Sequence, residues 1–297
     1  MSEFRFDGRV AVVTGAGRGI GRAYAHLLAE RGARVVVNDL GGSMQGEGVD
    51  AGPASAVVSE IVDVGGAAVA DTNDIATVAG AEALVAAAID EFGRLDVLVN
   101  NAGIIRWASL PEADADNLER HLAVHLVGSF NTMRAAWPHM VEQAYGRVVM
   151  TTSSGMFGLP NNLSYAAAKA GVIGLTRSLA TAGTEHGIKL NLIAPAAMTR
   201  MGGGERPDAD DMAPALVAPM VAFLAHEDCP VSGEIYAAGA GRFARIFIAQ
   251  TEGYVQSTPA TIEDIAQHWE AINDESGYSV PADLMSWSAA FTAQLRA

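Results

Sequence analysis

The sequence predicts a doubly wound α/β fold, in which a parallel sheet carries helices on both faces. Short apolar runs alternate with helical patterns along most of the chain, and a glycine cluster joins the first run to the first helix. Half of the 297 residues are hydrophobic and only 18% are charged, so the chain can bury a large core. Strict alternation of strand and helix favours a parallel sheet, because the crossover helices cover both of its faces.

The elements follow from the local patterns in order along the chain. Residues 10–13 form an apolar run, residues 14–21 a glycine-rich turn, and residues 22–31 a helical pattern that Gly32 ends. Further strands are expected where short runs are rich in β-branched or apolar residues, at 34–38, 66–70, 95–100, 147–152, 189–193 and 234–238. Further helices are expected where apolar residues recur at helical spacing, at 54–64, 78–92, 114–140, 164–186 and 215–225.

Two segments depart from this alternation. Residues 200–213 are polar and rich in glycine, and they follow a strand end, so we interpret them as a mobile lid. Residues 242–297 do not continue the alternation of strands and helices, but they carry seven aromatic residues, from Phe243 to Phe291. We therefore predict one domain at 1–241 and a C-terminal helical extension at 242–297 that packs on the core or on a partner subunit.

Charge and composition exclude several classes of function. The net charge of −15 repels phosphate backbones, so nucleic acid is not an expected partner. The single Cys229 cannot form an internal disulfide, and residues 1–10 lack an apolar export signal. No apolar stretch approaches the roughly 18 residues of a membrane span. These observations favour a cytoplasmic protein that acts on a small molecule and has no membrane partner.

The glycine cluster indicates a dinucleotide site in a Rossmann-type fold. Gly15, Gly19 and Gly21 lie between a strand and a helix, where bare backbone N–H groups can approach a pyrophosphate that the helix N-terminus favours. Asp39 ends the second strand, where a carboxylate meets the adenosine ribose and repels a 2′-phosphate. Arg18 is the counter-argument, because it can hold that phosphate. NAD is therefore the expected cofactor, and NADP is less favoured.

Tyr165 and Lys169 form the second chemical signal. They are four residues apart on a predicted helix, so their side chains share one face. A phenol that acts as a base near neutral pH needs its pKa lowered by about 2–3 units, or about 3–4 kcal/mol. One ammonium about 4 Å away supplies about 4 kcal/mol at an effective dielectric near 20. Lysine is rare here, since Lys169 and Lys189 are the only lysines among 19 basic residues, which indicates a chemical role.

These signals together resemble the short-chain dehydrogenase/reductase family. The motifs that carry the resemblance are Thr14-Gly15-x-x-x-Gly19-Ile20-Gly21, Asn100-Asn101-Ala102-Gly103, Tyr165-x-x-x-Lys169 and Pro195. A closer resemblance is to the (3R)-hydroxyacyl-CoA dehydrogenase domains of peroxisomal multifunctional enzymes, also called 17β-hydroxysteroid dehydrogenase type 4. It rests on residues 22–25, 37–42, 124–130, 134–137 and 238–241. It extends nearly end to end and implies a homodimer, or the homotetramer common in the wider family.

The resemblance implies a role for each matched residue. Tyr165 would be the general base, Lys169 would lower its pKa and hold the nicotinamide ribose, and a serine would bind the substrate oxygen. Ser153 takes that place if the following loop is one residue short, whereas a count back from Tyr165 gives Thr152. His125 stands where the family has an asparagine that anchors a proton-relay water. The remaining cofactor contacts would come from Ile20, Asp74, Ile75, Asn101, Ala102, Gly103, Pro195 and Thr199.

The substrate is less constrained than the reaction. The resemblance implies hydride transfer between NAD and a secondary alcohol, with a (3R)-hydroxyacyl-CoA as the first expectation. A steroid or other bulky alicyclic alcohol is the alternative, with an apolar lining expected from Ile105, Trp107, Met156, Phe157, Leu159 and Met198. A dinucleotide sensor without catalysis is a third reading, which the intact Ser153, Tyr165 and Lys169 oppose. His121 and His125 share a helix face, but the sequence offers no third ligand, so no metal site is predicted.

Overall fold

The computed structural model describes residues 3–202, 210–256 and 258–296, and divides the chain into two compact units. The first unit spans Met1–Arg245 and the second Ile246–Ala297. The division lies four residues beyond the boundary expected at residue 241. Among the described residues, no helix combines the length and apolarity needed to cross a membrane.

The first unit is built on one eight-stranded sheet in the order β3-β2-β1-β4-β5-β6-β7-β8. The strands from β1 to β7 pair in parallel register, which confirms the predicted doubly wound architecture. Their bounds are β1 Val10–Thr14, β2 Arg34–Asn38, β3 Ala67–Asp71, β4 Val97–Asn100, β5 Gly146–Thr151, β6 Ile188–Pro195, β7 Ile235–Gly239 and β8 Arg242–Ile246. The strand order reverses between β1 and β4, and ligands of such sheets bind in the crevice at the carboxyl ends of these strands.

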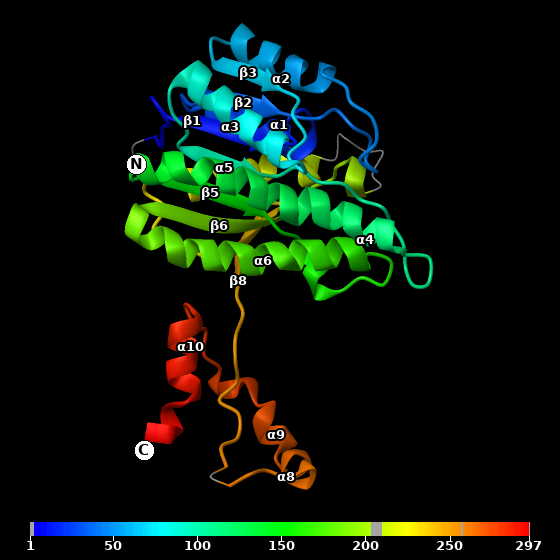
Figure 1. Cartoon of the computed structure of the whole chain (residues 1–297), viewed down its shortest axis with the longest axis vertical. Helices are drawn as coiled ribbons and strands as arrows, with labels where there is room; N and C mark the ends of the chain where they lie inside the picture. The colour runs from blue at the N-terminus through cyan, green and yellow to red at the C-terminus, as the bar shows by residue number, and fades with distance from the viewer. Residues whose placement is uncertain (1–2, 203–209, 257, 297) are drawn as a thin grey trace. The chain divides into compact units, whose positions relative to one another are not determined.

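Helices cover the sheet on both faces (Figure 1). Their bounds are α1 Gly19–Glu30, α2 Gly52–Asp63, α3 Val78–Phe92, α4 Ala115–His121, α5 Gly128–Glu142, α6 Leu163–Gly183 and α7 Ala218–Ala225. Helices α1, α2 and α7 pack together over a core that includes Tyr24, Leu28 and Val221. Helices α3, α5 and α6 cover the other face. Central strands are buried on both sides, which explains why β1 reads as an unbroken apolar run.

Three local features differ from the expected elements. Residues 242–246 form the edge strand β8 rather than the start of a helical extension, and they follow a two-residue turn in which Ala240 and Gly241 both have positive φ. The helix expected at 114–140 contains a π-helical segment, Leu122–Val127, between α4 and α5. The two ends of the segment interpreted as a lid form short 3₁₀ helices, at Arg200–Gly202 and Asp210–Met212, and its residues 203–209 lie outside the described residues.

The second unit is a small helical assembly. It contains α8 Ile262–Gln267, α9 Trp269–Ile272 and α10 Leu284–Phe291. Thr261 and Asp283 each begin a helix with a capping box. Its ring contacts are local, with Tyr254 stacked on His268 and Trp287 on Phe291. Many large apolar side chains stay exposed in this unit, so its few helices do not bury a core of their own.

Candidate active site

A cleft of about 640 Å³ opens at the carboxyl ends of the strands, where the strand order reverses. It is lined by backbone and side chains from the glycine loop, the ends of β2, β4 and β5, and helix α6. The predicted site residues that line it are Gly15, Arg18, Gly19, Ile20, Asp39, Asp74, Ile75, Asn101, Ala102, Gly103, His125, Ser153, Tyr165, Lys169, Pro195 and Thr199. The predicted residue Gly21 does not line it.

The glycine loop has no room for side chains at two of its three predicted positions. A Cβ on Gly15 would lie 2.8 Å from Ala102 Cα, and one on Gly21 would lie 2.2 Å from the Gly15 carbonyl oxygen. Gly19 needs its positive φ of +54°, and a Cβ there would make only ordinary contact with Thr199, 3.6 Å away. Helix α1 begins at Gly19 without a side-chain cap. This bare, open helix N-terminus fits a pyrophosphate.

Asp39 is held at the end of β2 by two backbone N–H groups. Gly17 N donates to its Oδ2 at 2.8 Å, and Gly41 N donates to its Oδ1 at 2.7 Å. A Cβ on Gly17 would collide with the Asp39 carboxylate, so Gly17 is a glycine that the sequence reasoning did not single out. Arg18 reaches the carbonyl of Gly42 at 3.5 Å. Arg200 also lines the cleft, and burial lowers its pKa, as does the charge of Arg18.

Asn101 ties β4 to β1 below the glycine loop. Its backbone N and that of Ala102 donate to Thr14 Oγ1, and its Nδ2 donates to the carbonyls of Thr14 and Gly15. Its Oδ1 is buried and has no hydrogen-bond partner among the described residues. An orphaned acceptor of this kind at the cleft fits a bound polar ligand.

Ser153 and Tyr165 lie next to each other in the cleft. Ser153 follows β5 and caps the short helix at Ser154–Phe157, and its Oγ accepts a hydrogen bond from Gly155 N at 3.0 Å. Burial raises the pKa of Tyr165, and hydrogen bonding with Ser153 opposes that rise. The two hydroxyls can therefore share a proton and one substrate oxygen. Thr152 instead donates its hydroxyl to the Lys169 carbonyl at 2.8 Å and does not line the cleft, so the geometry favours Ser153.

Lys169 is 3% exposed and lies beneath Tyr165 on α6. Its Nζ donates to the Thr151 carbonyl at 2.7 Å and lies 5.8 Å from the centroid of the Tyr165 ring. Burial lowers the pKa of Lys169 to about 7. The expectation that Lys169 lowers the pKa of Tyr165 assumed a full ammonium charge about 4 Å away. In this structure burial raises the pKa of Tyr165 and hydrogen bonding with Ser153 opposes that rise, while Lys169 Nζ is turned toward a main-chain carbonyl.

His125 lies in the π-helical segment with its ring edge against Tyr165, at a centroid distance of 5.1 Å. π-Helical turns of this kind are frequent at functional sites. Its Nε2 lies 2.9 Å from the Ile104 carbonyl, and Nδ1 is buried with no partner among the described residues. A Cβ on Gly103 would strike this ring, which explains the need for glycine there. Burial lowers the pKa of His125 well below its ordinary value.

The two histidines on this helix do not form a metal pair with a third ligand. His121 Nδ1 lies 2.7 Å from the Asn117 carbonyl, and its Nε2 accepts from Arg106 N. Within the described residues, no group of three or more His, Cys, Asp or Glu side chains is placed to hold a metal ion. Both rings instead stack near Tyr165.

The apolar lining differs in part from the expected one. Ile105, Trp107 and Leu159 line the cleft, whereas Met156, Phe157 and Met198 do not. Sequence reasoning missed Asn162 and the loop at 42–46, which also line it. The loop is held by Met44, whose carbonyl accepts from Ile105 N at 2.9 Å. In the sequence this loop is visible as the glycine-rich stretch after β2, for which no function was predicted.

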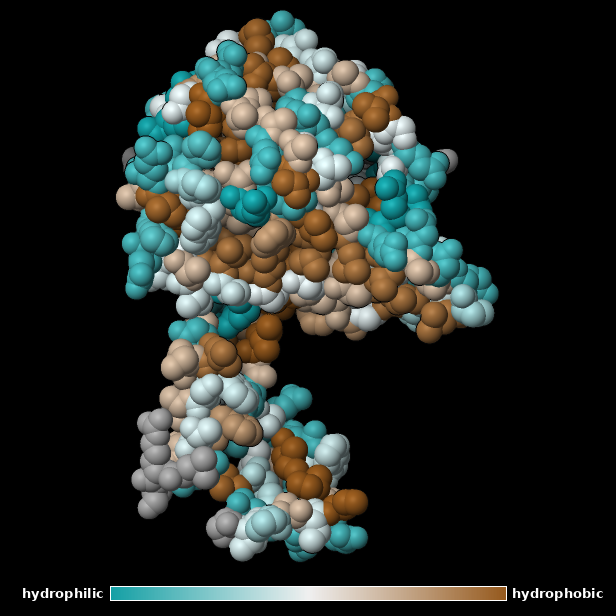
Figure 2. Space-filling model, in the orientation of Figure 1, coloured by the Kyte–Doolittle hydropathy of each residue, from teal (hydrophilic) through white to brown (hydrophobic). Residues whose placement is uncertain are grey.

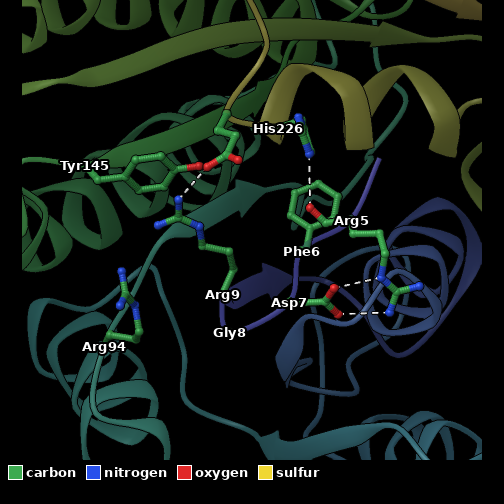
Figure 3. Close-up of a pocket in the computed structure, with 9 residues that line it drawn as sticks. Arg5, Phe6, Asp7, Gly8, Arg9, Arg94, Tyr145 and His226 are labelled. Carbon is green, nitrogen blue, oxygen red and sulfur yellow. Dashed lines mark hydrogen bonds and ion pairs between the residues drawn. The ribbon is translucent and has the colours of Figure 1, made fainter. Parts of the chain in front are cut away.

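A second pocket, of about 390 Å³, opens at the amino ends of β1, β4 and β5 (Figure 3). Its charged groups pair with one another. Arg9 donates to Glu227 at 2.7 Å and to the buried Asp96 at 3.0 Å, and Arg5 pairs with Asp7. Because these charges are already paired, this pocket offers no free catalytic group.

Comparisons with known proteins agree with this geometry. A family model described as short chain dehydrogenase matches residues 9–209. A protein named as a short-chain type dehydrogenase/reductase in Mycobacterium tuberculosis is 43% identical over 92% of this chain and 96% of its own length. Peroxisomal multifunctional enzyme type 2 of Drosophila melanogaster is 44% identical over 92% of this chain, but the match covers only 46% of that enzyme.

Solved structures give the same result. The full-length Drosophila multifunctional enzyme superimposes with a TM-score of 0.81 at 36% identity, covering 98% of this chain and 50% of that one. A 7α-hydroxysteroid dehydrogenase in complex with NADH and 7-oxo glycochenodeoxycholic acid superimposes with a TM-score of 0.71 at 30% identity, covering 80% of this chain and 95% of that one. The chain therefore spans about half the length of the multifunctional enzyme, and nearly the whole length of the mycobacterial protein and of the 7α-hydroxysteroid dehydrogenase.

Proposed function

The chain belongs to the short-chain dehydrogenase/reductase family, and from that premise we propose that it oxidises a (3R)-hydroxyacyl-CoA with NAD. Members of this family are oxidoreductases that act on CH–OH groups. The observation that carries the proposal is the meeting of Ser153 and Tyr165 above the buried Lys169, in a cleft that a bare glycine loop borders. The match to multifunctional enzymes along nearly the whole chain supports the acyl-CoA substrate.

The residues divide the work by position. Ser153 Oγ holds the alcohol oxygen, and Tyr165 takes its proton as general base. Lys169, hydrogen-bonded to the Thr151 carbonyl, lies where it can exchange a proton with solvent through the cleft and hold a ribose hydroxyl. A bound nicotinamide dinucleotide supplies the acceptor for the hydride that leaves the alcohol carbon. Gly19 leaves the N-terminus of α1 bare for its pyrophosphate, while Gly15 and Gly21 let the loop pack tightly against Ala102 and against itself.

Asp39 supports NAD over NADP. Its carboxylate, fixed by Gly17 N and Gly41 N, lies at the end of β2, where it can accept from ribose hydroxyls and repel a 2′-phosphate. Arg18 and Arg200 are the groups that oppose this preference.

A steroid alcohol is the second candidate. The likeness to a hydroxysteroid dehydrogenase and the apolar lining from Ile105, Trp107 and Leu159 favour it. The phosphates of CoA would also need cations, and Arg106 is already paired with Asp116 and Arg245 with Glu234. Arg206 lies outside the described residues.

We also propose that the protein acts as a homodimer or homotetramer, without nucleic acid or membrane partners. A band of apolar side chains crosses the face where α5 and α6 lie (Figure 2), and Val127 and Phe130 are exposed on its helices. The exposed aromatics of the second unit, such as Trp269, support the same idea. A monomeric mass by light scattering would contradict it. Cytoplasmic location stays a prediction.

The test is NADH formation by the purified protein. A (3R)-hydroxyacyl-CoA and a 17β-hydroxysteroid are supplied separately, each with NAD and with NADP. We expect turnover of the CoA ester with NAD, and a loss of at least about 100-fold in Tyr165→Phe, because a general base contributes about 10²–10⁴-fold. Turnover of the steroid alone would replace the proposed substrate, and an unchanged Tyr165→Phe protein would show that this hydroxyl is not the base.

A further inference from the structure

Asn162 stands at the N-cap of α6, three residues before Tyr165, yet its side chain does not cap the helix. Asparagine is among the best N-caps, because its side-chain oxygen accepts from a backbone N–H in the first turn. Here that hydrogen bond is not made, and the side chain has no hydrogen bond with any of the residues that the structure describes. The amide is therefore left free for another partner.

The amide is turned into the cleft, beside the reacting groups. Asn162 is only 6% exposed and lines the cleft. Its Nδ2 and Ser153 Oγ each lie 3.4 Å from the position that a Cβ on Gly155 would take, and Tyr165 Cε1 lies 3.5 Å from it. The three side chains therefore surround one small volume. The Asn162 amide therefore borders this volume without a hydrogen bond to the protein, and a ligand that fills the volume can supply one.

The backbone of Asn162 is fixed on both sides. Its N donates to the Leu159 carbonyl at 3.1 Å, and its carbonyl accepts from Ala166 N at 2.9 Å. A parallel β-bridge also joins it to Ala108. The amide is thus presented from a rigid position, as a substrate-binding group requires.

Ser153 and Tyr165 take the oxygen that reacts, so Asn162 is left to meet a second oxygen of the same substrate. A 3-hydroxyacyl thioester has such an oxygen, the carbonyl two carbons from the alcohol, and a carbonyl accepts from an amide NH₂. A secondary alcohol on a steroid ring has no oxygen at that place. We propose that Asn162 Nδ2 donates a hydrogen bond to the thioester carbonyl and selects 3-hydroxyacyl substrates over alcohols without it. This inference rests on the proposed function.

The test compares two substrates that differ only in this oxygen. One is (3R)-hydroxybutanoyl-CoA, and the other is its thioether analogue, in which the C1 carbonyl is a methylene group. Asn162→Ser removes the amide and leaves a residue that is equally favourable at the N-cap position, so α6 should begin as before. Asn161→Ala is the matched control, because Asn161 is exposed and does not line the cleft. For each protein, kcat/KM is measured with both substrates, and NADH affinity is measured separately by fluorescence.

We expect Asn162→Ser to lower kcat/KM for the thioester by roughly 10- to 100-fold, which is the range for a donor lost in a buried site. The thioether should change less than about twofold, and Asn161→Ala and NADH affinity should not change. An equal loss with both substrates, or no loss with either, would overturn the inference while wild-type turnover of the thioester upholds the proposed function. A wild-type protein that oxidises a hydroxysteroid but not the thioester would overturn both.

Discussion

The buried polar groups at the two ends of the same parallel strands differ in whether they have hydrogen-bond or ion-pair partners. At the amino ends of β1, β4 and β5, each charged group finds a partner: Asp96 is fully buried, accepts from Val10 N, and pairs with both Arg9 and Arg94. At the carboxyl ends, the buried Asn101 Oδ1 and His125 Nδ1 have no partner among the described residues.

This difference separates stability from function. Polar groups that are paired inside the protein stabilise the fold, whereas buried groups without a partner cost free energy that is recovered only when a ligand binds. The amino end is accordingly a place where substitution should cost stability and spare activity. The carboxyl end should show the reverse.

The largest expected effect is at the amino end. Asp96→Asn leaves Arg9 and Arg94 without their shared carboxylate and weakens the bond from Val10 N. Removing one partner of a buried ion pair costs about 3–5 kcal/mol, and the lower end applies because both guanidinium groups are partly exposed. Urea unfolding should show this loss, while kcat/KM of the folded protein stays within about twofold.

Glu227→Gln is the control for this prediction. It removes a carboxylate that also pairs with Arg9 but is itself exposed. Its cost should stay below about 1 kcal/mol. Equal losses in the free energy of unfolding for Asp96→Asn and Glu227→Gln would show that the burial of Asp96 is not the cause of its larger contribution to stability.

A smaller effect, of the opposite kind, is expected at the carboxyl end. Gly155→Ala places a methyl group at ordinary contact distance from Asn162, Ser153 and Tyr165, and its backbone needs no positive φ. The fold should tolerate it, but substrate loses that space, and one misplaced methyl group in a pocket costs about 1–3 kcal/mol of specificity. Steady-state kinetics should therefore show a loss of kcat/KM of roughly tenfold or more.

Gly174→Ala is its matched control, because a Cβ there meets nothing within 4 Å. Alanine is the better helix former inside α6, so the control should be as stable as the wild type or slightly more so. If Gly155→Ala lowers the free energy of unfolding by as much as it lowers the free energy equivalent of kcat/KM, substitution at the carboxyl end costs stability as well as activity. The contrast between the two ends would then be wrong.

The layout of the fold was predictable because the central strands are buried on both faces. Val10–Thr14 and Arg34–Asn38 therefore stand out as β-branched runs. β8 was missed for the opposite reason. It is a largely exposed edge strand with arginines at 242 and 245, so it has no apolar run. The π-helical segment at 122–127 was missed because apolar residues continue through it at nearly helical spacing.

The site was predictable where chemistry restricts the residue type. A bare loop needs glycine, and a Tyr-x-x-x-Lys pair is visible as a spacing. Asn162 was not predictable, because an asparagine before a helix is read as a cap, and only the structure shows that its amide turns away. The protonation of Lys169 was also beyond the sequence, since it depends on burial and on the direction of Nζ.

The pH dependence of stability tests that protonation. Burial lowers the pKa of Lys169 from its ordinary 10.5 to about 7 in the folded chain. Between these values the unfolded chain binds a proton that the folded chain lacks, so this group makes the free energy of unfolding rise with pH, by up to about 1.4 kcal/mol per pH unit. The histidines His121 and His125, whose pKa values burial also lowers, titrate below this window.

Urea unfolding of ligand-free wild type and Lys169→Met from pH 7 to 9.5 should give a difference in stability that grows with pH. Lys189→Met controls for the removal of an ammonium group elsewhere. If the difference in stability between wild type and Lys169→Met does not change with pH, Lys169 keeps its charge in the folded chain. The carboxyl end would then hold a buried charge with a partner, like the charges at the amino end, and the contrast between the two ends would not apply to Lys169.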